Sequence, residues 1–410
     1  MDASVALPRS DTKVIGLIST AHFLSHVYML VLPPLFPLLK DVYGVSFAAL
    51  GLALTVFNVA TGLTQAPMGF LVDRFGARAI LIAGLIVEAI AFMMIGLFPS
   101  YWALIALMAV AGLANAVYHP ADYTILSASV DGKRMGRAFS IHTFAGYLGF
   151  AVAPVMMVFL LGAVGWQMAL VIAGGAGLAV ALVLMAFSGV LKDETPAGAQ
   201  AGGRKPKPEE AAAGSGPQGI KLLLSLPVIM GFLFFVGISM TNGGFTSFGV
   251  SALVTIYEAP LSQANVPLTA YLFASAAGVL AGGWVADRTN RHSLVAGGCF
   301  LLVGLFVACI AAFSPSLAMV GVLFGLAGFF SGVVAPSRDM MIRAVTPAGS
   351  TGKVFGFVST GFNLGGAITP LMFGLLLDQV ADPTILFWVI AGLSVATIAT
   401  VLTAGNVSRR

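Results

Sequence analysis

Long apolar runs separated by short polar turns constrain this chain more than any other feature. Hydrophobic residues make up 59% of its 410 residues and charged residues only 9%, whereas soluble domains carry about a quarter charged residues. A helix needs about 20 apolar residues to cross a bilayer, so the chain has room for about a dozen spans. The composition therefore predicts an all-α polytopic membrane protein and excludes an extended soluble domain.

We predict twelve transmembrane helices from these runs. Their expected ranges are 14–39, 47–71, 79–98, 101–130, 136–162, 165–190, 220–257, 262–286, 293–313, 315–346, 351–378 and 383–405. The longest ranges are expected to include bends or terminal turns. Cys299 and Cys309 lie ten residues apart in one run, about 15 Å along a helix, which is too far for a disulfide.

Basic residues gather at alternate ends of these spans. Lys40 is the only basic residue in a loop predicted on the other side. By the positive-inside rule, both termini are expected in the cytoplasm and the chain in the inner (cytoplasmic) membrane. The net charge of +4 therefore reflects orientation rather than nucleic-acid binding.

A single long polar segment divides the chain. It is rich in Pro, Gly, Ala and charge and predicts a flexible cytoplasmic linker over 191–219. We expect a six-helix bundle on each side of it, over 1–190 and 220–410.

The two halves repeat at an offset of about 215 residues. The matching pairs are Gly69 and Gly283, Asp73 and Asp287, Pro120 and Pro336, Gly136 and Gly352, Phe139 and Phe355, Gly149 and Gly365, and Pro154 and Pro370. Residues 69–78 and their counterpart 283–288 each form a short charged turn between apolar runs. Its most specific residues are Gly69, Leu71, Asp73, Arg74, Gly76 and Arg78.

Repeated six-span halves with this turn resemble the major facilitator superfamily. The resemblance covers the whole chain and implies a secondary transporter whose halves rock about a site near the membrane midplane. It also implies that Asp73, Arg74 and Arg78, with Asp287 and Arg288 in the second half, latch the halves on the cytoplasmic side. The alternative is that these charges only set topology. Ala77 departs from the family, which usually has a basic residue there.

Spans 4 and 5 resemble the fosmidomycin-resistance exporters within that superfamily. The resemblance rests on residues 118–122 (Tyr-His-Pro-Ala-Asp) and 136–140 (Gly-Arg-Ala-Phe-Ser), and on Gly146, Gly149 and Pro154. Ala121 stands where that group usually has an acid, and Asp122 follows one position later. The glycine and proline pattern partly matches the antiporter motif of the family, although close packing and a kink explain it equally well.

Ionisable residues inside the spans are costly in hydrocarbon and are functional candidates by default. Asn115, His119 and Asp122 are spaced four and three apart, which predicts one stripe on span 4. Arg338 occupies the position that corresponds to Asp122 in the second half. We expect Asp122 or His119 to carry a proton and Arg338 to hold an anion. The alternative is a permanent ion pair between Asp122 and Arg338.

The roles of four other ionisable residues remain open. His22 and His26, four apart on span 1, suit a proton or substrate site, a metal or a structural role. His142 is a candidate for gating or proton exit. Glu88 has no obvious partner and is either protonated against lipid or paired across helices.

Asp339 and Arg343 have the favourable spacing and order for a pair within one helix, which would leave Arg338 free. We treat Asp339 as a candidate of the substrate site together with Arg338. Other candidates, chosen only by their positions in the spans, are Asn242, Phe245, Tyr271 and Asn363.

The function predicted first is proton-coupled transport of a small organic anion or drug-like compound, with efflux as the direction. The alternatives are an uptake symporter for carboxylates or similar nutrients, and a divalent-metal carrier that uses the span 1 histidines. An intramembrane metal hydrolase and a receptor are least consistent with the motifs. We expect no bound cofactor or resident metal, and a monomer that works with a substrate, protons and the lipid bilayer.

Overall fold

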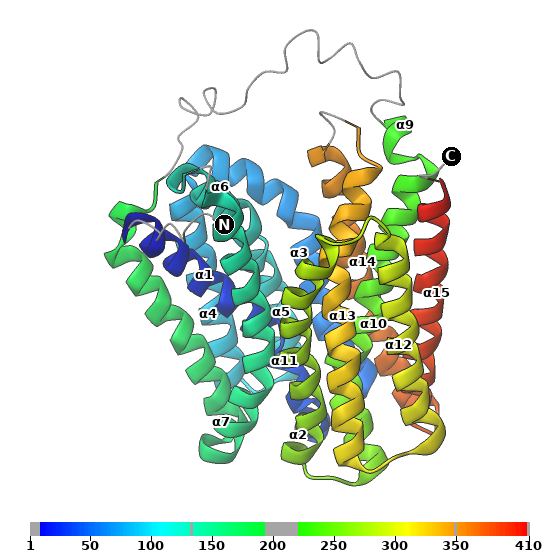
Figure 1. Ribbon diagram of the computed structural model, residues 1–410. Helices are drawn as coiled ribbons and strands as arrows, with labels where there is room; N and C mark the ends of the chain where they lie inside the picture. Colours follow the sequence, from blue (N-terminus) through cyan, green and yellow to red (C-terminus); the bar gives the residue numbers. More distant parts are fainter. Residues whose placement is uncertain (1–8, 132–133, 193–219, 348–350, 408–410) are drawn as a thin grey trace. The chain divides into compact units, whose positions relative to one another are not determined.

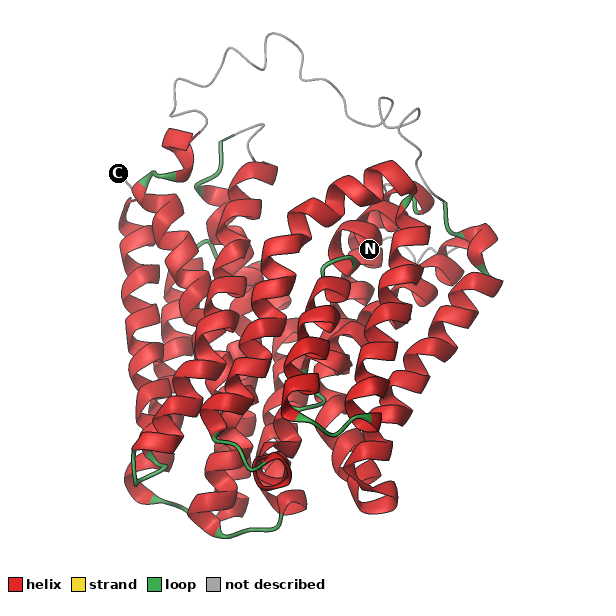
Figure 2. Ribbon diagram, turned by 180° about the vertical axis from the view of Figure 1, so that it is seen from behind, coloured by secondary structure: helices red, strands yellow, loops and turns green. Residues whose placement is uncertain are grey.

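The computed structural model describes residues 9–131, 134–192, 220–347 and 351–407. Helices and their connecting turns make up this part of the chain, and no strand occurs in it (Figures 1 and 2). The predicted linker at 191–219 lies outside the described residues, apart from its first two. The all-α prediction is confirmed for the described chain.

The helices of the first half are α1 (Arg9–Met29), the 3-10 turn η1 (Pro33–Leu35), α2 (Phe36–Tyr43), α3 (Phe47–Phe75), α4 (Ala77–Leu97), α5 (Tyr101–Asn115), α6 (Tyr118–Ser129), α7 (Met135–Ala186) and the turn η3 (Ser188–Val190). The second half has α9 (Ile220–Leu223), α10 (Leu226–Tyr257), α11 (Leu261–Ala286), α12 (His292–Phe313), α13 (Leu317–Ala344), α14 (Thr351–Gln379) and α15 (Ile385–Val407).

Ten helical segments of the described chain are long and apolar enough to cross a membrane, and Ile385–Val401 is a shorter apolar helix. One of the ten, Met135–Ala186, covers two of the predicted spans. Its backbone leaves the helical region at Gly165, where φ is 81° and ψ is 163°. Glycine tolerates this conformation because it has no Cβ. The predicted break between spans 5 and 6 therefore coincides with a single residue.

The predicted span 101–130 matches one apolar segment, Tyr101–Ser129, which contains a short break. α5 ends at Asn115 and α6 begins at Tyr118, two residues before Pro120. Proline has no N–H to donate and clashes with the carbonyl four residues earlier, here that of Ala116. The predicted stripe of Asn115, His119 and Asp122 is therefore interrupted between its first and second members.

Two compact units are present, and the segment Pro33–Thr55 of the first half is grouped with the second unit. One unit takes Met1–Leu32 and Val56–Gly203, and the other takes Pro33–Thr55 and Arg204–Arg410. Within the first unit, α7 packs along α1 and α4. Within the second, α11 packs along α13, α10 along α14, and α12 along α15.

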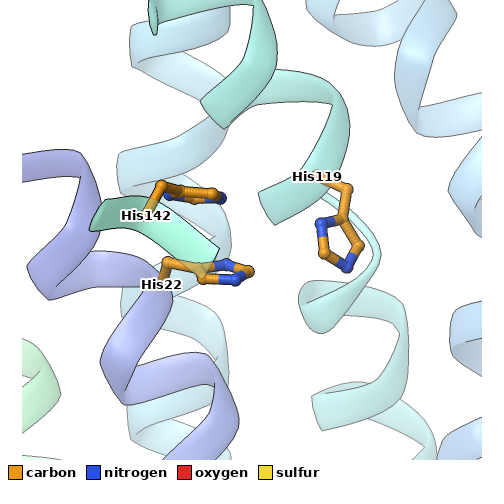
Figure 3. Close-up of side chains that lie close together, drawn as sticks. All are labelled: His22, His119 and His142. Atoms are coloured by element: carbon orange, nitrogen blue, oxygen red, sulfur yellow. The ribbon is translucent and has the colours of Figure 1, made fainter. Parts of the chain in front are cut away.

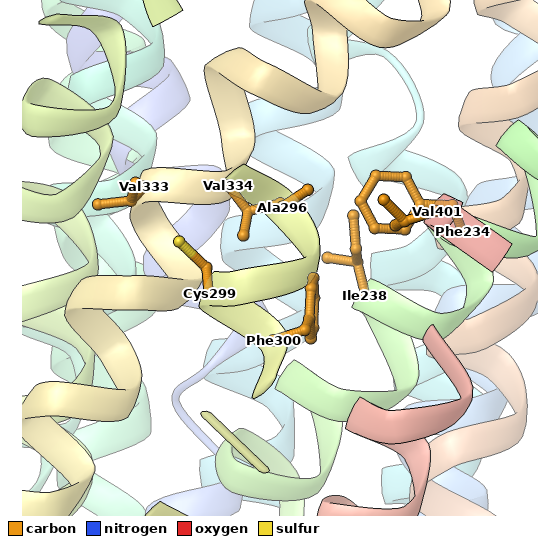
Figure 4. Packing of buried hydrophobic residues seen from close by; sticks show 8 residues of the cluster. All are labelled: Phe234, Ile238, Ala296, Cys299, Phe300, Val333, Val334 and Val401. Atoms are coloured by element: carbon orange, nitrogen blue, oxygen red, sulfur yellow. The ribbon is translucent and has the colours of Figure 1, made fainter. Parts of the chain in front are cut away.

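An apolar cluster holds the middle of the second unit together. Figure 4 shows residues of α10, α12, α13 and α15 pointing toward one another, among them Phe234, Phe300 and Val401. Cys299 belongs to this cluster, and both cysteines of the chain are free. In lipid, packing of this kind rather than hydrophobic burial holds the helices together.

Candidate functional site

Asp122 of α6 lies at the centre of a buried group of ionisable side chains in the first unit. Its side chain is 0% exposed, and one carboxylate oxygen lies 3.4 Å from Nδ1 of His22 on α1 and 3.7 Å from Nε2 of His142 on α7. Neither carboxylate oxygen has a hydrogen-bond partner among the described residues. A buried carboxylate without hydrogen bonds is costly, and a proton bound by this group removes that cost.

The imidazoles of the first unit form a compact group around this carboxylate. The rings of His22 and His142 stack with their centroids 3.8 Å apart, and that of His119 lies 5.3 Å from His22 (Figure 3). His119 is exposed, whereas His22 and His142 are buried. Nitrogen atoms of these three histidines lie within 4.8 Å of one another, close enough for the three to share a metal ion. The geometry thus permits either proton exchange or metal binding.

His26 lies beside His22, as their spacing on one helix suggested, with the two ring centroids 4.5 Å apart. Its ring contacts that of Phe150, with centroids 4.3 Å apart. A Cβ built on Gly146 of α7 would lie 2.9 Å from His22 Nε2 and 2.9 Å from His26 Cε1. Gly146 therefore lets α7 approach the histidines of α1, which is the close-packing interpretation of this glycine.

Glu88 has a partner that the sequence did not reveal. Its Oε1 accepts a hydrogen bond of 3.0 Å from Nδ2 of Asn115, and the carboxyl group is fully buried. Asn115 is the last residue of α5, so this bond ties α4 to the break before His119. Asn115 thus contacts Glu88, while Asp122 lies beside the histidines.

Arg338 of α13 lies in an aromatic setting in the second unit. Its guanidinium carbon lies 4.9 Å from the ring centroid of Phe235 and 5.1 Å from that of Phe362. Its Nε donates a hydrogen bond of 2.8 Å to Oδ1 of Asp339. The prediction that Asp339 pairs with Arg343 and leaves Arg338 free is therefore wrong, because the neighbouring guanidinium takes that carboxylate.

Three predicted substrate residues of the second unit lie together. The hydroxyl of Tyr271 donates to Oδ1 of Asn242 at 2.8 Å, and the ring of Phe245 stacks on that of Tyr271 at 4.4 Å. Phe245 is 0% and Tyr271 2% exposed. In this conformation they pack inside the unit, and Asn242 and Asn363 are only half-buried.

The charged turns lie at the ends of α3 and α11. Asp73 is exposed and makes no hydrogen bond or ion pair within the described part of its own unit. Arg74 lies over the ring of Phe75, and Arg78 donates to the carbonyl of Ser188 at 3.0 Å. A Cβ on Gly69 would meet nothing within 4 Å.

The second turn is similarly open. Asp287 is exposed, and Arg288 covers the ring of Trp284 with its guanidinium carbon 3.9 Å from the centroid.

Several residues around these groups were missed by sequence reasoning. Phe235 and Phe362 flank Arg338, and the hydroxyl oxygen of Ser331 lies 3.3 Å from that of Tyr271. Aromatic and small polar residues are common in apolar spans, so they carry no signal of their own. Finding them requires knowing which helices pack against α13 and α11, which the sequence does not show.

Comparison with known proteins agrees with this architecture. The family model described as Major Facilitator Superfamily matches residues 18–259 and 237–408. The chain is 24% identical to the fosmidomycin resistance protein of Escherichia coli strain K12 over 382 residues, which cover 92% of this chain and 89% of that protein. It is 23% identical to the D-galactonate transporter of Escherichia coli O6:H1, with 90% of each chain covered.

A solved structure supports the same fold. It is that of a bacterial homologue of the human lysosomal transporter Spinster in an inward-facing and occupied conformation. The TM-score is 0.73 at 16% identity, with 98% of this chain and 96% of that chain covered. The chain is thus a polytopic membrane transporter rather than an enzyme, and it belongs to the major facilitator superfamily.

Proposed function

We propose that this protein is a proton-coupled secondary transporter that moves a small organic anion or drug-like compound across the inner membrane by alternating access, with efflux as its direction. The observation that carries this proposal is the buried group of Asp122, His22 and His142. A carboxylate that lies 0% exposed beside two imidazoles, inside a transporter, is suited to bind and release one proton in each cycle.

Arg338 supports an anionic substrate. Intramembrane arginines are costly and mark substrate pathways or fixed ion pairs. The rings of Phe235 and Phe362 hold the guanidinium plane, as cation–π contacts do. Asn242, Tyr271 and Asn363 are proposed as neutral partners for the rest of the substrate. One similar protein is named for D-galactonate, a carboxylate, and another for resistance to fosmidomycin.

The full topology is part of the proposal. Counting α7 as two spans joined at Gly165 and α15 as one span gives twelve, with both termini in the cytoplasm. A green fluorescent protein fused to the C-terminus fluoresces only in the cytoplasm, so a dark fusion would contradict this orientation.

The test uses purified protein in liposomes that contain a pH dye. D-galactonate, fosmidomycin and other organic anions are added under an imposed pH gradient. We expect one anion class to drive proton movement, and Arg338→Ala to reduce its flux at least tenfold at unchanged expression. Lys221→Ala, which removes an exposed basic residue of the same unit, is the control. Anion flux at the normal rate in Arg338→Ala would remove the anion-site assignment.

Uptake of carboxylates by symport is the alternative direction of the same machinery. It is distinguished by the sign of proton movement, since a symporter acidifies the compartment that the anion enters. An antiporter makes that compartment more alkaline.

A divalent-metal carrier is the second candidate, because nitrogen atoms of His22, His119 and His142 converge within 4.8 Å. Imidazole nitrogens suit zinc, nickel and copper. Proton movement driven by Zn²⁺ or Ni²⁺ alone, abolished by His119→Ala, would favour this candidate. Metal-independent movement would exclude it.

A further inference from the structure

A contact between the beginning of α3 and the end of α14 joins residues 331 positions apart. Oδ1 of Asp378 accepts a hydrogen bond of 2.9 Å from the backbone N–H of Phe47, and Oδ2 accepts one of 2.7 Å from that of Ala48. Phe47 and Ala48 are the first two residues of α3. A single carboxylate thus caps this helix from a distant part of the chain.

The remaining N–H groups of this first turn are satisfied locally. The N–H of Ala49 donates to Oγ of Ser46 at 3.2 Å, and that of Leu50 donates to the Ser46 carbonyl at 3.2 Å. A helix N-terminus has unpaired donors and a partial positive charge, which favour a carboxylate. Without Asp378, two of these donors lose their partner.

Beyond this cap, α3 and α14 remain in close contact. A Cβ on Gly374 of α14 would lie 2.6 Å from the carbonyl oxygen of Phe47, and one on Gly51 would collide with that of Pro370. Oγ1 of Thr55 donates to the carbonyl of Ala367 at 2.7 Å. Small residues let membrane helices approach this closely.

These contacts belong to a segment that sequence places in the first half. Pro33–Thr55 forms part of the second compact unit, and the rest of α3 belongs to the first. Phe36 and Phe47 also pack on Phe248 of α10, with ring centroids 5.2 and 5.8 Å apart. In the proposed topology, this segment and the end of α14 lie at the outer face.

We propose that Asp378 is an outer latch that holds the segment Pro33–Thr55 against α14 and must release it when the transporter opens outward. The proposal rests on alternating access. α3 ends at the Gly69–Arg78 turn, so one helix of 29 residues carries the outer latch at its beginning and the inner charged turn at its end.

The test compares Asp378→Asn with Asp382→Asn. Asp382 lies four residues further on and accepts hydrogen bonds from the N–H and Oγ1 of Thr384 in its own turn, at 2.9 and 2.7 Å. These bonds lower the pKa of Asp382. The two variants therefore make the same chemical change in neighbouring carboxylates, but only Asp378 reaches α3.

Spin labels at Val42 and Val380, both exposed, report the separation of the two segments in the full-length protein. Cys299 and Cys309 are first replaced by serine. We expect Asp378→Asn to raise the population of long distances at least threefold and to speed amide exchange at Phe47 and Ala48 at least tenfold. Asp382→Asn should leave both unchanged.

Faster exchange at an unchanged label distance would reduce Asp378 to a local cap and overturn the latch. Equal distances in both variants would also overturn it, and thermal melting of each variant excludes misfolding as the cause. Neither the label distance nor the exchange rate depends on a substrate or a proton gradient. A failure of the proposed proton coupling would therefore not change the outcome of this test.

Discussion

The side chains to which we assign the proton chemistry of the first unit depend on neighbours that are distant in the sequence. His22, Asp122 and His142 come from three helices and meet within 3.4 to 3.8 Å. Sequence reasoning identified each as a candidate because ionisable groups are rare in spans. It could not predict that His142 contacts Asp122, or that Glu88 pairs with Asn115, because both contacts depend on how the helices pack.

Gly146→Ala tests the packing beneath this group. The added Cβ would lie 2.9 Å from His22 Nε2 and from His26 Cε1, so we expect a loss of about 1–3 kcal/mol in stability from overpacking. We also expect impaired proton coupling. Gly175→Ala on the same helix is the matched control, because its Cβ would meet nothing within 4 Å. Thermal unfolding in detergent compares the stability of the two variants, and proton movement in liposomes compares their coupling. Equal melting of the two variants would contradict the account.

Helices were the most predictable level of this structure. Apolar runs of about 20 residues located them, and the break at Gly165 falls where two spans were expected to meet. The break between α5 and α6 was not predicted from Pro120. A proline in the first turn of a helix and a proline inside a helix cannot be told apart in the sequence. Pro336, its counterpart in the repeat, lies inside the unbroken α13.

Pro120→Ala tests whether this break positions the site. An alanine restores the N–H and removes the clash with Ala116, so α5 and α6 should join into one helix. His119 and Asp122 would then rotate away from their partners. We expect proton flux to fall at least tenfold and amide exchange at 116–120 to slow. Pro336→Ala is the control and should keep its flux. A normal flux in Pro120→Ala would show that the break has no role in coupling.

At the scale of the whole molecule, the repeat and the charged turns predicted the superfamily, and the family match confirms it. The compact units were less predictable. The segment Pro33–Thr55 packs with the second half through Asp378, Gly374 and Phe248. Contacts between residues so far apart in the chain leave no local pattern in a sequence.

The central claim is that the Asp122 group carries the proton that drives transport. The most direct measurement is proton movement in dye-filled liposomes, together with exchange of the labelled substrate that the anion panel identifies, for the unaltered protein and for Asp122→Asn. The asparagine keeps the shape of the side chain but cannot bind a proton. We predict that substrate-driven proton movement is lost while exchange of labelled substrate across the membrane continues. Proton movement at the normal rate in Asp122→Asn would contradict the account.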